Sequence, residues 1–196
     1  MQKAARKPRA VVSPVEWTPA ESAELYGIRS WGAGYFDIDE GGNVTVSVPN
    51  NGARVAVSLM DLIAGMQQRG LQMPALLRLD NLLEAQIALL NDSFAKAILT
   101  LGYQAGYHGV FPIKVNQQCA VIEEIARVGA RYGHGLECGS KAELLIALAY
   151  LDPDKGYIIC NGYKDEEFVD LALQSLRLGF KCFFVLETPT ELPLIL

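Results

Sequence analysis

The sequence predicts an α/β protein, namely a partial (β/α)8 TIM-like barrel of about five βα units preceded by a short β-rich N-terminal segment. From residue 58 onward, apolar runs of strand length alternate with longer segments whose apolar residues recur at helical spacing. Such a series specifies parallel strands joined by right-handed helical crossovers. No glycine-rich phosphate fingerprint follows the first predicted strand, which favours a barrel over an open dinucleotide-binding sheet.

The ends of the predicted strands support the barrel further. Each strand ends at or beside a polar residue: Arg78, Lys114, Glu137, Asn161 and Glu187. The carboxyl ends of parallel strands meet at one rim, which is the active-site face of a barrel. A complete barrel needs eight such units, so we expect this chain to be a fragment or a truncated product.

Composition excludes several classes of protein. The 196 residues are 51% hydrophobic and 20% charged, which suffices for one substantial core. A net charge of -5 gives no basic surface for nucleic acid, and no apolar run approaches the ~18 residues of a membrane span. The cysteines form no C-x-x-C pair and lie in or beside apolar runs, as expected of reduced thiols in a cytoplasmic protein: Cys119, Cys138, Cys160 and Cys182.

Three regions are predicted along the chain. Residues 1–14 form a flexible basic arm, for which a transit or surface-binding segment is the alternative. Residues 15–57 form the β-rich leader, and residues 58–196 form the truncated barrel.

The leader begins with a short helix and continues as strands. Thr18 and Glu21 form a capping-box pattern, and Gly27 ends the helix. Strands are predicted at residues 34–39 and 44–49, joined by a polar turn, with a further extended run from residue 53.

The barrel part repeats a strand, a polar corner and an amphipathic helix. Ser58 and Ser140 each begin a predicted helix with an acidic residue three positions later. The predicted strands are residues 75–79, the run that ends at Lys114, residues 134–137, 157–160 and 182–186.

Lys114 follows the apolar run GVFPI and is a candidate for amine chemistry. A single lysine near a strand end is most often a solvated cap. A lysine amine can also condense with a carbonyl, as in Schiff-base aldolases and pyridoxal phosphate enzymes. That chemistry needs a neutral amine, which burial at the strand end would favour. Glu137, one strand over, is a candidate ion-pair partner, and the alternative is a carboxylate that stabilises the next helix N-terminus.

Three sequence words carry a resemblance to a known family: GVFPIKVNQ, GLECGSKAELL and ICNGYKDEEF. In this order and spacing they resemble the biosynthetic arginine decarboxylases, pyridoxal phosphate enzymes of the alanine-racemase-like barrel fold. The resemblance extends to WTPAESAELYGIRSWGAGYFDIDEGGNVTV and to ALLRLDNLL, and so covers nearly the whole chain.

The resemblance implies decarboxylation of L-arginine to agmatine and CO2 in polyamine biosynthesis, with pyridoxal 5'-phosphate as cofactor. It implies that Lys114 holds the cofactor, that Glu137 pairs with this lysine once substrate has displaced it, and that Asn161 and Ser140 lie near the cofactor. It also implies Mg2+ and a homo-oligomer in the full-length protein, although no carboxylate cluster in the sequence is typical of a metal site. The family's remaining site elements would lie beyond Leu196.

Alternatives stay open. The chain itself could be an inactive fragment that serves only for binding or subunit pairing, because a barrel that lacks strands leaves sheet edges unpaired. A Schiff-base aldolase is a third possibility. His108 and His134 precede the catalytic ends of their strands, so structural roles are expected for both. Tyr163 and Lys164 could contact substrate or cofactor, or belong to a turn with Asp165 as helix cap.

Overall fold

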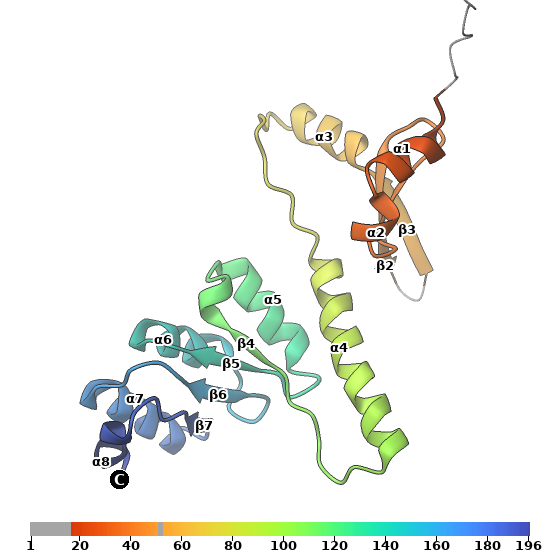
Figure 1. Cartoon of the computed structure of the whole chain (residues 1–196). Coiled ribbons are helices and arrows are strands. Elements are labelled where there is room, and N and C mark those ends of the chain that lie inside the picture. Colours follow the sequence, from red (N-terminus) through yellow and green to blue (C-terminus); the bar gives the residue numbers. More distant parts are fainter. Residues whose placement is uncertain (1–16, 51–52) are drawn as a thin grey trace, which may run out of the picture. The chain divides into compact units, whose positions relative to one another are not determined.

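A computed structural model describes residues 17–50 and 53–196 (Figure 1). The chain divides into two compact units, one up to Leu76 and one from Leu77 onward. The predicted basic arm, residues 1–14, lies outside the described residues.

The first unit is a three-stranded antiparallel sheet in the order β1-β2-β3, with short helices. Its elements are α1 (Pro19–Leu25), α2 (Ile28–Trp31), β1 (Phe36–Ile38), β2 (Val44–Asn50), β3 (Ala53–Ser58) and α3 (Leu59–Gln68). Val46 lies opposite both Phe36 and Val57 and is 1% exposed, so the predicted hairpin does bury one face. The capping box of Thr18 and Glu21 is present at the start of α1.

The second unit contains a four-stranded parallel sheet in the order β4-β5-β6-β7. Its elements are α4 (Asp80–Leu101), β4 (Val110–Pro112), the 3-10 turn η1 (Ile113–Val115), α5 (Cys119–Gly129), β5 (Gly135–Cys138), α6 (Lys141–Tyr150), β6 (Tyr157–Cys160), α7 (Glu166–Arg177), β7 (Lys181–Phe184), the 3-10 turn η2 (Pro189–Glu191) and α8 (Leu192–Ile195). The α/β class and the parallel sheet are confirmed.

One predicted strand is wrong. Residues 75–79 form neither helix nor strand, and Leu76 is 77% exposed. This run contains alanine, leucine and arginine but no β-branched or aromatic residue, so its strand propensity is low. Arg78 therefore ends no strand, and the described residues contain four of the predicted strand–helix units rather than five.

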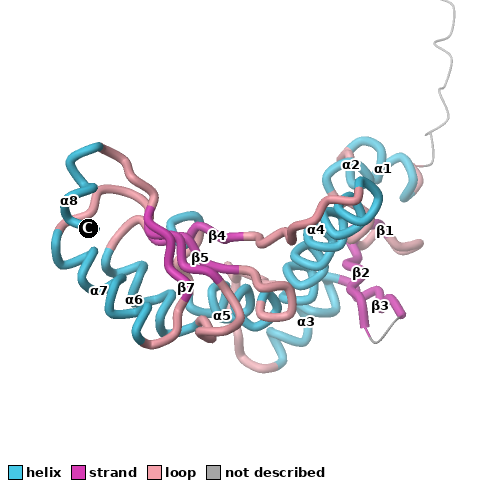
Figure 2. Tube along the Cα trace, turned by 90° about the horizontal axis from the view of Figure 1, so that it is seen from below, coloured by secondary structure: helices cyan, strands magenta, loops and turns pink. Residues whose placement is uncertain are grey.

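The helices α5, α6 and α7 lie on one face of the parallel sheet (Figure 2). Each strand pairs with the next one in sequence, so right-handed crossovers place every connecting helix on the same side. Leu136 and Cys138 of β5 point toward these helices and are fully buried. Because side chains alternate along a strand, Glu137 between them points to the opposite face.

Two glycines let the strand ends approach closely. A Cβ on Gly135 would collide with the backbone carbonyl of Tyr157 on the neighbouring strand. Gly162, in the loop after β6, has φ +69° and lies against the carbonyl of Gly139 in the loop after β5. Gly135 therefore allows close pairing of β5 and β6 at their amino ends, and Gly162 allows the loops after these two strands to pack backbone to backbone at the carboxyl edge.

Candidate active site

Lys114 lies at the carboxyl edge of the sheet, in the turn η1 directly after β4. Ile113 beside it is fully buried and anchors the turn in the core. The Lys114 side chain is 61% exposed, so the strand end does not bury this amine among the described residues. The chain leaves the strand before residue 114, and the 3-10 turn directs this side chain outward from the strand end.

Glu137 on the adjacent strand faces this amine. Lys114 Nζ is 3.5 Å from Glu137 Oε1, and the Glu137 side chain is only 9% exposed. Pro112 and Glu137 are directly opposite in the β4–β5 register, which places the residue two positions after Pro112 beside this carboxylate. The structure thus brings together the two residues predicted to be catalytic.

The carboxylate of Glu137 is buried yet poorly satisfied. Within the described part of the chain, neither of its oxygens accepts a hydrogen bond, and the amine at 3.5 Å is its ion-pair partner. Buried polar atoms normally have partners, and unpartnered ones concentrate where a protein binds something. An exposed amine beside a buried carboxylate with free acceptor sites suits a cofactor that carries an aldehyde and a substrate that carries an amine.

Asn161 follows β6 at the same edge. Its backbone N–H continues the ladder to Cys138 at 2.8 Å, and its side-chain oxygen accepts from the Gly162 N–H at 2.9 Å. The same N–H also donates to Glu187 Oε1 at 3.1 Å. The Nδ2 group of Asn161 makes no hydrogen bond among the described residues, which leaves it available to a ligand.

Ser140 is the N-cap of α6. Its hydroxyl accepts from the Glu143 N–H at 3.3 Å, while Glu143 Oε2 accepts from the N–H of Gly139 rather than of Ser140, at 2.7 Å. The carboxylate therefore fixes the loop between β5 and α6. Ser140 lies on this loop and is exposed, and nothing in the described residues joins it directly to Lys114.

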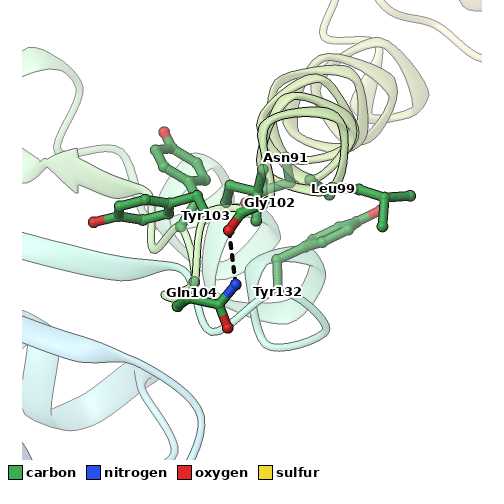
Figure 3. A pocket seen from close by; sticks show the side chains of 10 residues that line it. Asn91, Leu99, Gly102, Tyr103, Gln104 and Tyr132 are labelled. Carbon is green, nitrogen blue, oxygen red and sulfur yellow. Dashed lines mark hydrogen bonds between the residues drawn. The ribbon is translucent and has the colours of Figure 1, made fainter.

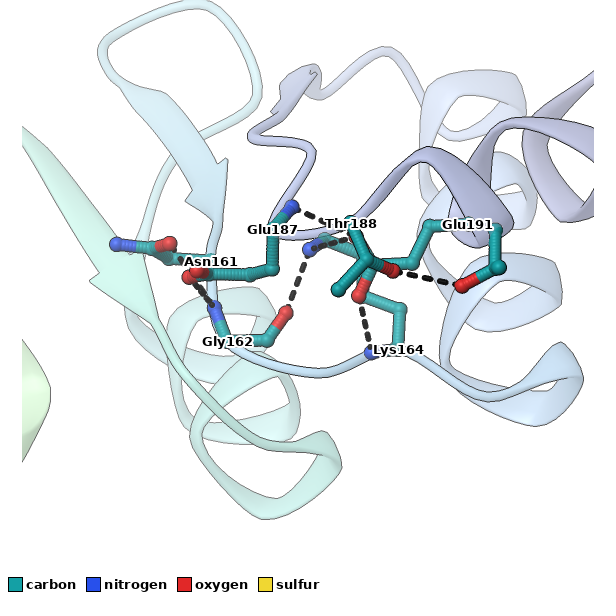
Figure 4. Close-up of polar contacts among 7 residues, drawn as sticks. Asn161, Gly162, Lys164, Glu187, Thr188 and Glu191 are labelled. Carbon is teal, nitrogen blue, oxygen red and sulfur yellow. Dashed lines mark hydrogen bonds and ion pairs between the residues drawn. The ribbon is translucent and has the colours of Figure 1, made fainter.

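A buried ion pair that the sequence did not predict lies behind this edge (Figure 4). Lys164 Nζ is 3.3 Å from Glu191 Oε2, and the two side chains are 0% and 5% exposed. Backbone N–H groups of Lys164 and Glu187 donate to the same carboxylate at 3.1 and 2.9 Å. These hydrogen bonds hold the pKa of Glu191 below its ordinary value, and the bond from the Glu187 N–H has the largest effect.

The positions of Lys164 and Asp165 agree with the interpretation of NGYKD as a turn followed by a helix cap. Asp165 caps α7 by accepting from the Phe168 N–H at 2.9 Å. Lys164 is buried and faces Glu191 rather than the open edge, whereas Tyr163 is 84% exposed. Glu191 lies 27 residues from Lys164, and no local pattern joins them.

Three cysteines line the helix face of the sheet. Cys138 and Cys160 lie opposite each other in register, and both are fully buried. Burial raises the pKa of the Cys138 thiol, and donation to Cys182 together with burial raises that of Cys160. The contacts with Cys160 and with Ser175 Oγ, the latter at 2.8 Å, lower the pKa of Cys182 to about 7. These thiols face away from Lys114.

Both histidines lie at the amino ends of the strands. His134 directly precedes β5 and is 7% exposed, and burial lowers its pKa. His108 precedes β4, and its ring meets Tyr157 edge-on at 4.7 Å. Neither residue reaches the edge that carries Lys114.

A cavity of about 460 Å³ also lies on the amino-terminal side, between α4 and the segment that leads to β4 (Figure 3). Gln104 Nε2 donates to the Gly102 carbonyl at 2.7 Å within it. Its other labelled lining residues are Asn91, Leu99, Tyr103 and Tyr132. It is separate from the site at the carboxyl edge.

Comparison with known proteins places this arrangement in a family. Residues 90–195 match the family model described as "Pyridoxal-dependent decarboxylase, pyridoxal binding domain". The chain belongs to the pyridoxal-dependent decarboxylases. The matched region holds Lys114, Glu137, Ser140 and Asn161.

The chain is similar to several proteins that are named biosynthetic arginine decarboxylases. The chain is 43% identical to the biosynthetic arginine decarboxylase of Synechococcus sp. (strain RCC307) and 46% identical to that of Thermosynechococcus vestitus. The two matches cover 94% and 92% of this chain but only 29% and 28% of the length of the two relatives. The crystal structure of the biosynthetic arginine decarboxylase SpeA from Campylobacter jejuni matches with a TM-score of 0.79 and 33% identity, over 87% of this chain and 28% of that one. The predicted resemblance is confirmed.

Two further findings concern the described residues alone. They contain no helix long and apolar enough to cross a membrane. They also contain no group of three or more histidine, cysteine or acidic side chains that could hold a metal ion, so magnesium stays a prediction from the resemblance.

Proposed function

We propose that this chain is the N-terminal part of the pyridoxal phosphate barrel of an arginine decarboxylase, which converts L-arginine to agmatine and CO2 for polyamine biosynthesis. The observation that carries the proposal is the Lys114–Glu137 pair at the carboxyl edge of a parallel sheet. The relatives named arginine decarboxylase support the substrate.

The barrel prediction rests on the sheet. Four consecutive parallel strands lie in sequence order with their helices on one face, which is how a barrel wall is built. An open doubly wound sheet instead reverses its strand order and carries helices on both faces.

In this proposal Lys114 would hold the cofactor through its amine. Glu137 would form an ion pair with that amine once substrate has displaced the lysine from the cofactor. Asn161 Nδ2 and the loop of Ser140 would contact the cofactor from the two neighbouring strand ends. When bound, pyridoxal phosphate supplies an electron sink for the electrons left by the departing carboxylate. The chain's own residues orient the Lys114 amine and hold it beside Glu137 at the carboxyl edge.

Cytoplasmic location and homo-oligomer formation belong to the same proposal. All four cysteines are free, as in reducing compartments. The oligomer rests on the resemblance alone.

The test is reductive trapping. The protein is mixed with pyridoxal phosphate and reduced with borohydride, and labelled peptides are located by mass spectrometry. We expect the label on Lys114 and its loss in Lys114→Arg, while Lys96→Arg, which removes an exposed lysine on α4, leaves it unchanged. Equal labelling of exposed lysines, or a label that persists in Lys114→Arg, would refute the site. Release of CO2 from carboxyl-labelled L-arginine, compared with L-ornithine and L-lysine, tests the substrate.

A second candidate is a binding or subunit-pairing module without activity. It is favoured by the apolar side chains that the open face of the sheet leaves exposed, among them Phe183 at 54%. This candidate predicts self-association in sedimentation experiments and no selective label on Lys114.

A further inference from the structure

The Lys164–Glu191 pair is not explained by stability alone. The free energy that two charges lose when they leave water is roughly equal to what their mutual attraction returns. Well-packed apolar side chains at the same positions often give equal stability. Lys164 is the fully buried lysine among those that the structure describes. A buried ion pair can also serve to fix the geometry of the segments that it joins.

That geometry joins two loops at the carboxyl edge. The Glu191 carboxylate accepts from the N–H of Lys164, in the loop after β6, and from the N–H of Glu187, after β7. The Lys164 amine also donates to the Gly162 carbonyl at 2.6 Å. Glu187 in turn accepts from the Gly162 N–H at 3.1 Å, which closes a ring of bonds around Gly162 (Figure 4).

Gly162 is the residue through which this ring reaches the site. Its N–H also fixes the side-chain oxygen of Asn161, so that the free Nδ2 of Asn161 has one direction. Its left-handed backbone lies against Gly139, in the loop next to Glu137. Movement of this glycine would therefore move both Asn161 and the loop after β5.

We propose that Lys164 and Glu191 are positioning residues that hold the Asn161–Gly162 segment in place to receive the cofactor at the carboxyl edge. The inference rests on the proposed function. It adds residues that contact neither cofactor nor substrate and act through the two loops that they join. Holding a contact group within a fraction of an ångström is what gives a site its affinity.

The main variant is the double substitution Lys164→Met with Glu191→Leu, which replaces the pair by apolar side chains of similar size. Lys155→Met removes an exposed lysine from the opposite end of β6 and is the matched control. We expect the double variant to fold with a lower urea midpoint than the parent chain, because the backbone N–H groups of Lys164 and Glu187 lose their acceptor. Amide hydrogen exchange in residues 161–165 should become at least about tenfold faster, and the apparent affinity for pyridoxal phosphate at Lys114 about tenfold weaker or more. Glu191→Asp, which keeps the charge, should recover part of both effects.

The two readouts separate the inference from the proposed function. Unchanged exchange in the double variant would overturn the positioning role, and so would faster exchange with unchanged cofactor affinity. Absence of any Lys114 label in the parent chain would refute the proposed function and the cofactor part of the inference, while faster exchange in the variant would still show that the pair fixes the loop. If the double variant does not fold, Glu191→Gln keeps the side-chain size and serves for both readouts.

Discussion

Replacement of Glu137 by leucine should make the protein more stable. The carboxylate is 9% exposed, and in the described structure its oxygens accept no hydrogen bond. Its ion pair is with Lys114, which is 61% exposed, so water screens that attraction to about 1 kcal/mol or less. Burial of an unsatisfied polar group is unfavourable by about 1–3 kcal/mol, and more for a charged one. The balance predicts that Glu137→Leu raises the free energy of unfolding by about 1–2 kcal/mol.

Glu143 provides the matched control. It is also a buried glutamate, but its Oε2 accepts from the Gly139 N–H at 2.7 Å. Glu143→Leu removes that acceptor and leaves the N–H unpaired, so we expect a loss of about 1–3 kcal/mol. The same chemical change at two nearby buried sites should therefore shift stability in opposite directions.

The assay is urea unfolding of the chain followed by far-ultraviolet circular dichroism. The unfolding midpoint should rise for Glu137→Leu and fall for Glu143→Leu, with similar slopes. Borohydride trapping on the same samples should show that Glu137→Leu weakens the label on Lys114. A midpoint that falls equally in both variants would refute the reasoning, because Glu137 would then be as well satisfied as Glu143.

Three further predictions concern other parts of the second unit. Alanine at Gly162 or Gly179 is strained at φ +69° and +90° by about 1–2 kcal/mol, but only at Gly162 would its Cβ lie 2.7 Å from the Gly139 carbonyl, so urea unfolding should show a clearly larger loss for Gly162→Ala. Burial lowers the pKa of His134, so the unfolded chain takes up its proton at higher pH than the folded chain does; stability from this group is complete above about pH 6.5 and falls below it, and His134→Gln should flatten that slope. Cys182, with a pKa of about 7, should react with iodoacetamide faster as the pH rises through 7, and mass spectrometry of the Cys182 peptide measures its half-point.

Local patterns predicted the regular elements well. Strand β6 has the predicted bounds because Ile158 and Ile159 are β-branched and a glycine and an asparagine flank the run. The strand predicted at residues 75–79 was wrong because apolar character alone does not indicate a strand, and leucine and alanine have higher helix than strand propensity. In both cases residue type within five or six positions decides the outcome.

The candidate site was predictable only in part. Lys114 and Glu137 follow from strand order, because neighbouring parallel strands end side by side. The exposure of Lys114 depends on a 3-10 turn that the apolar run did not indicate. Glu191 was missed because its partner is 27 residues away, and that contact forms only once the two loops are folded.

The buried carboxylates at this edge divide into two kinds, and the division matches the proposed chemistry. The carboxylates of Glu143 and Glu191 accept hydrogen bonds from backbone N–H groups and thereby hold the loops to which those groups belong. Glu137 has the same side chain and similar burial, yet it keeps its acceptor sites open toward the amine. A sequence selected for stability alone would have satisfied or replaced that carboxylate, since most buried polar atoms in proteins are paired. A buried acid that accepts no hydrogen bond beside an exposed lysine therefore lowers stability at this position, and the satisfied acids around it keep the position rigid.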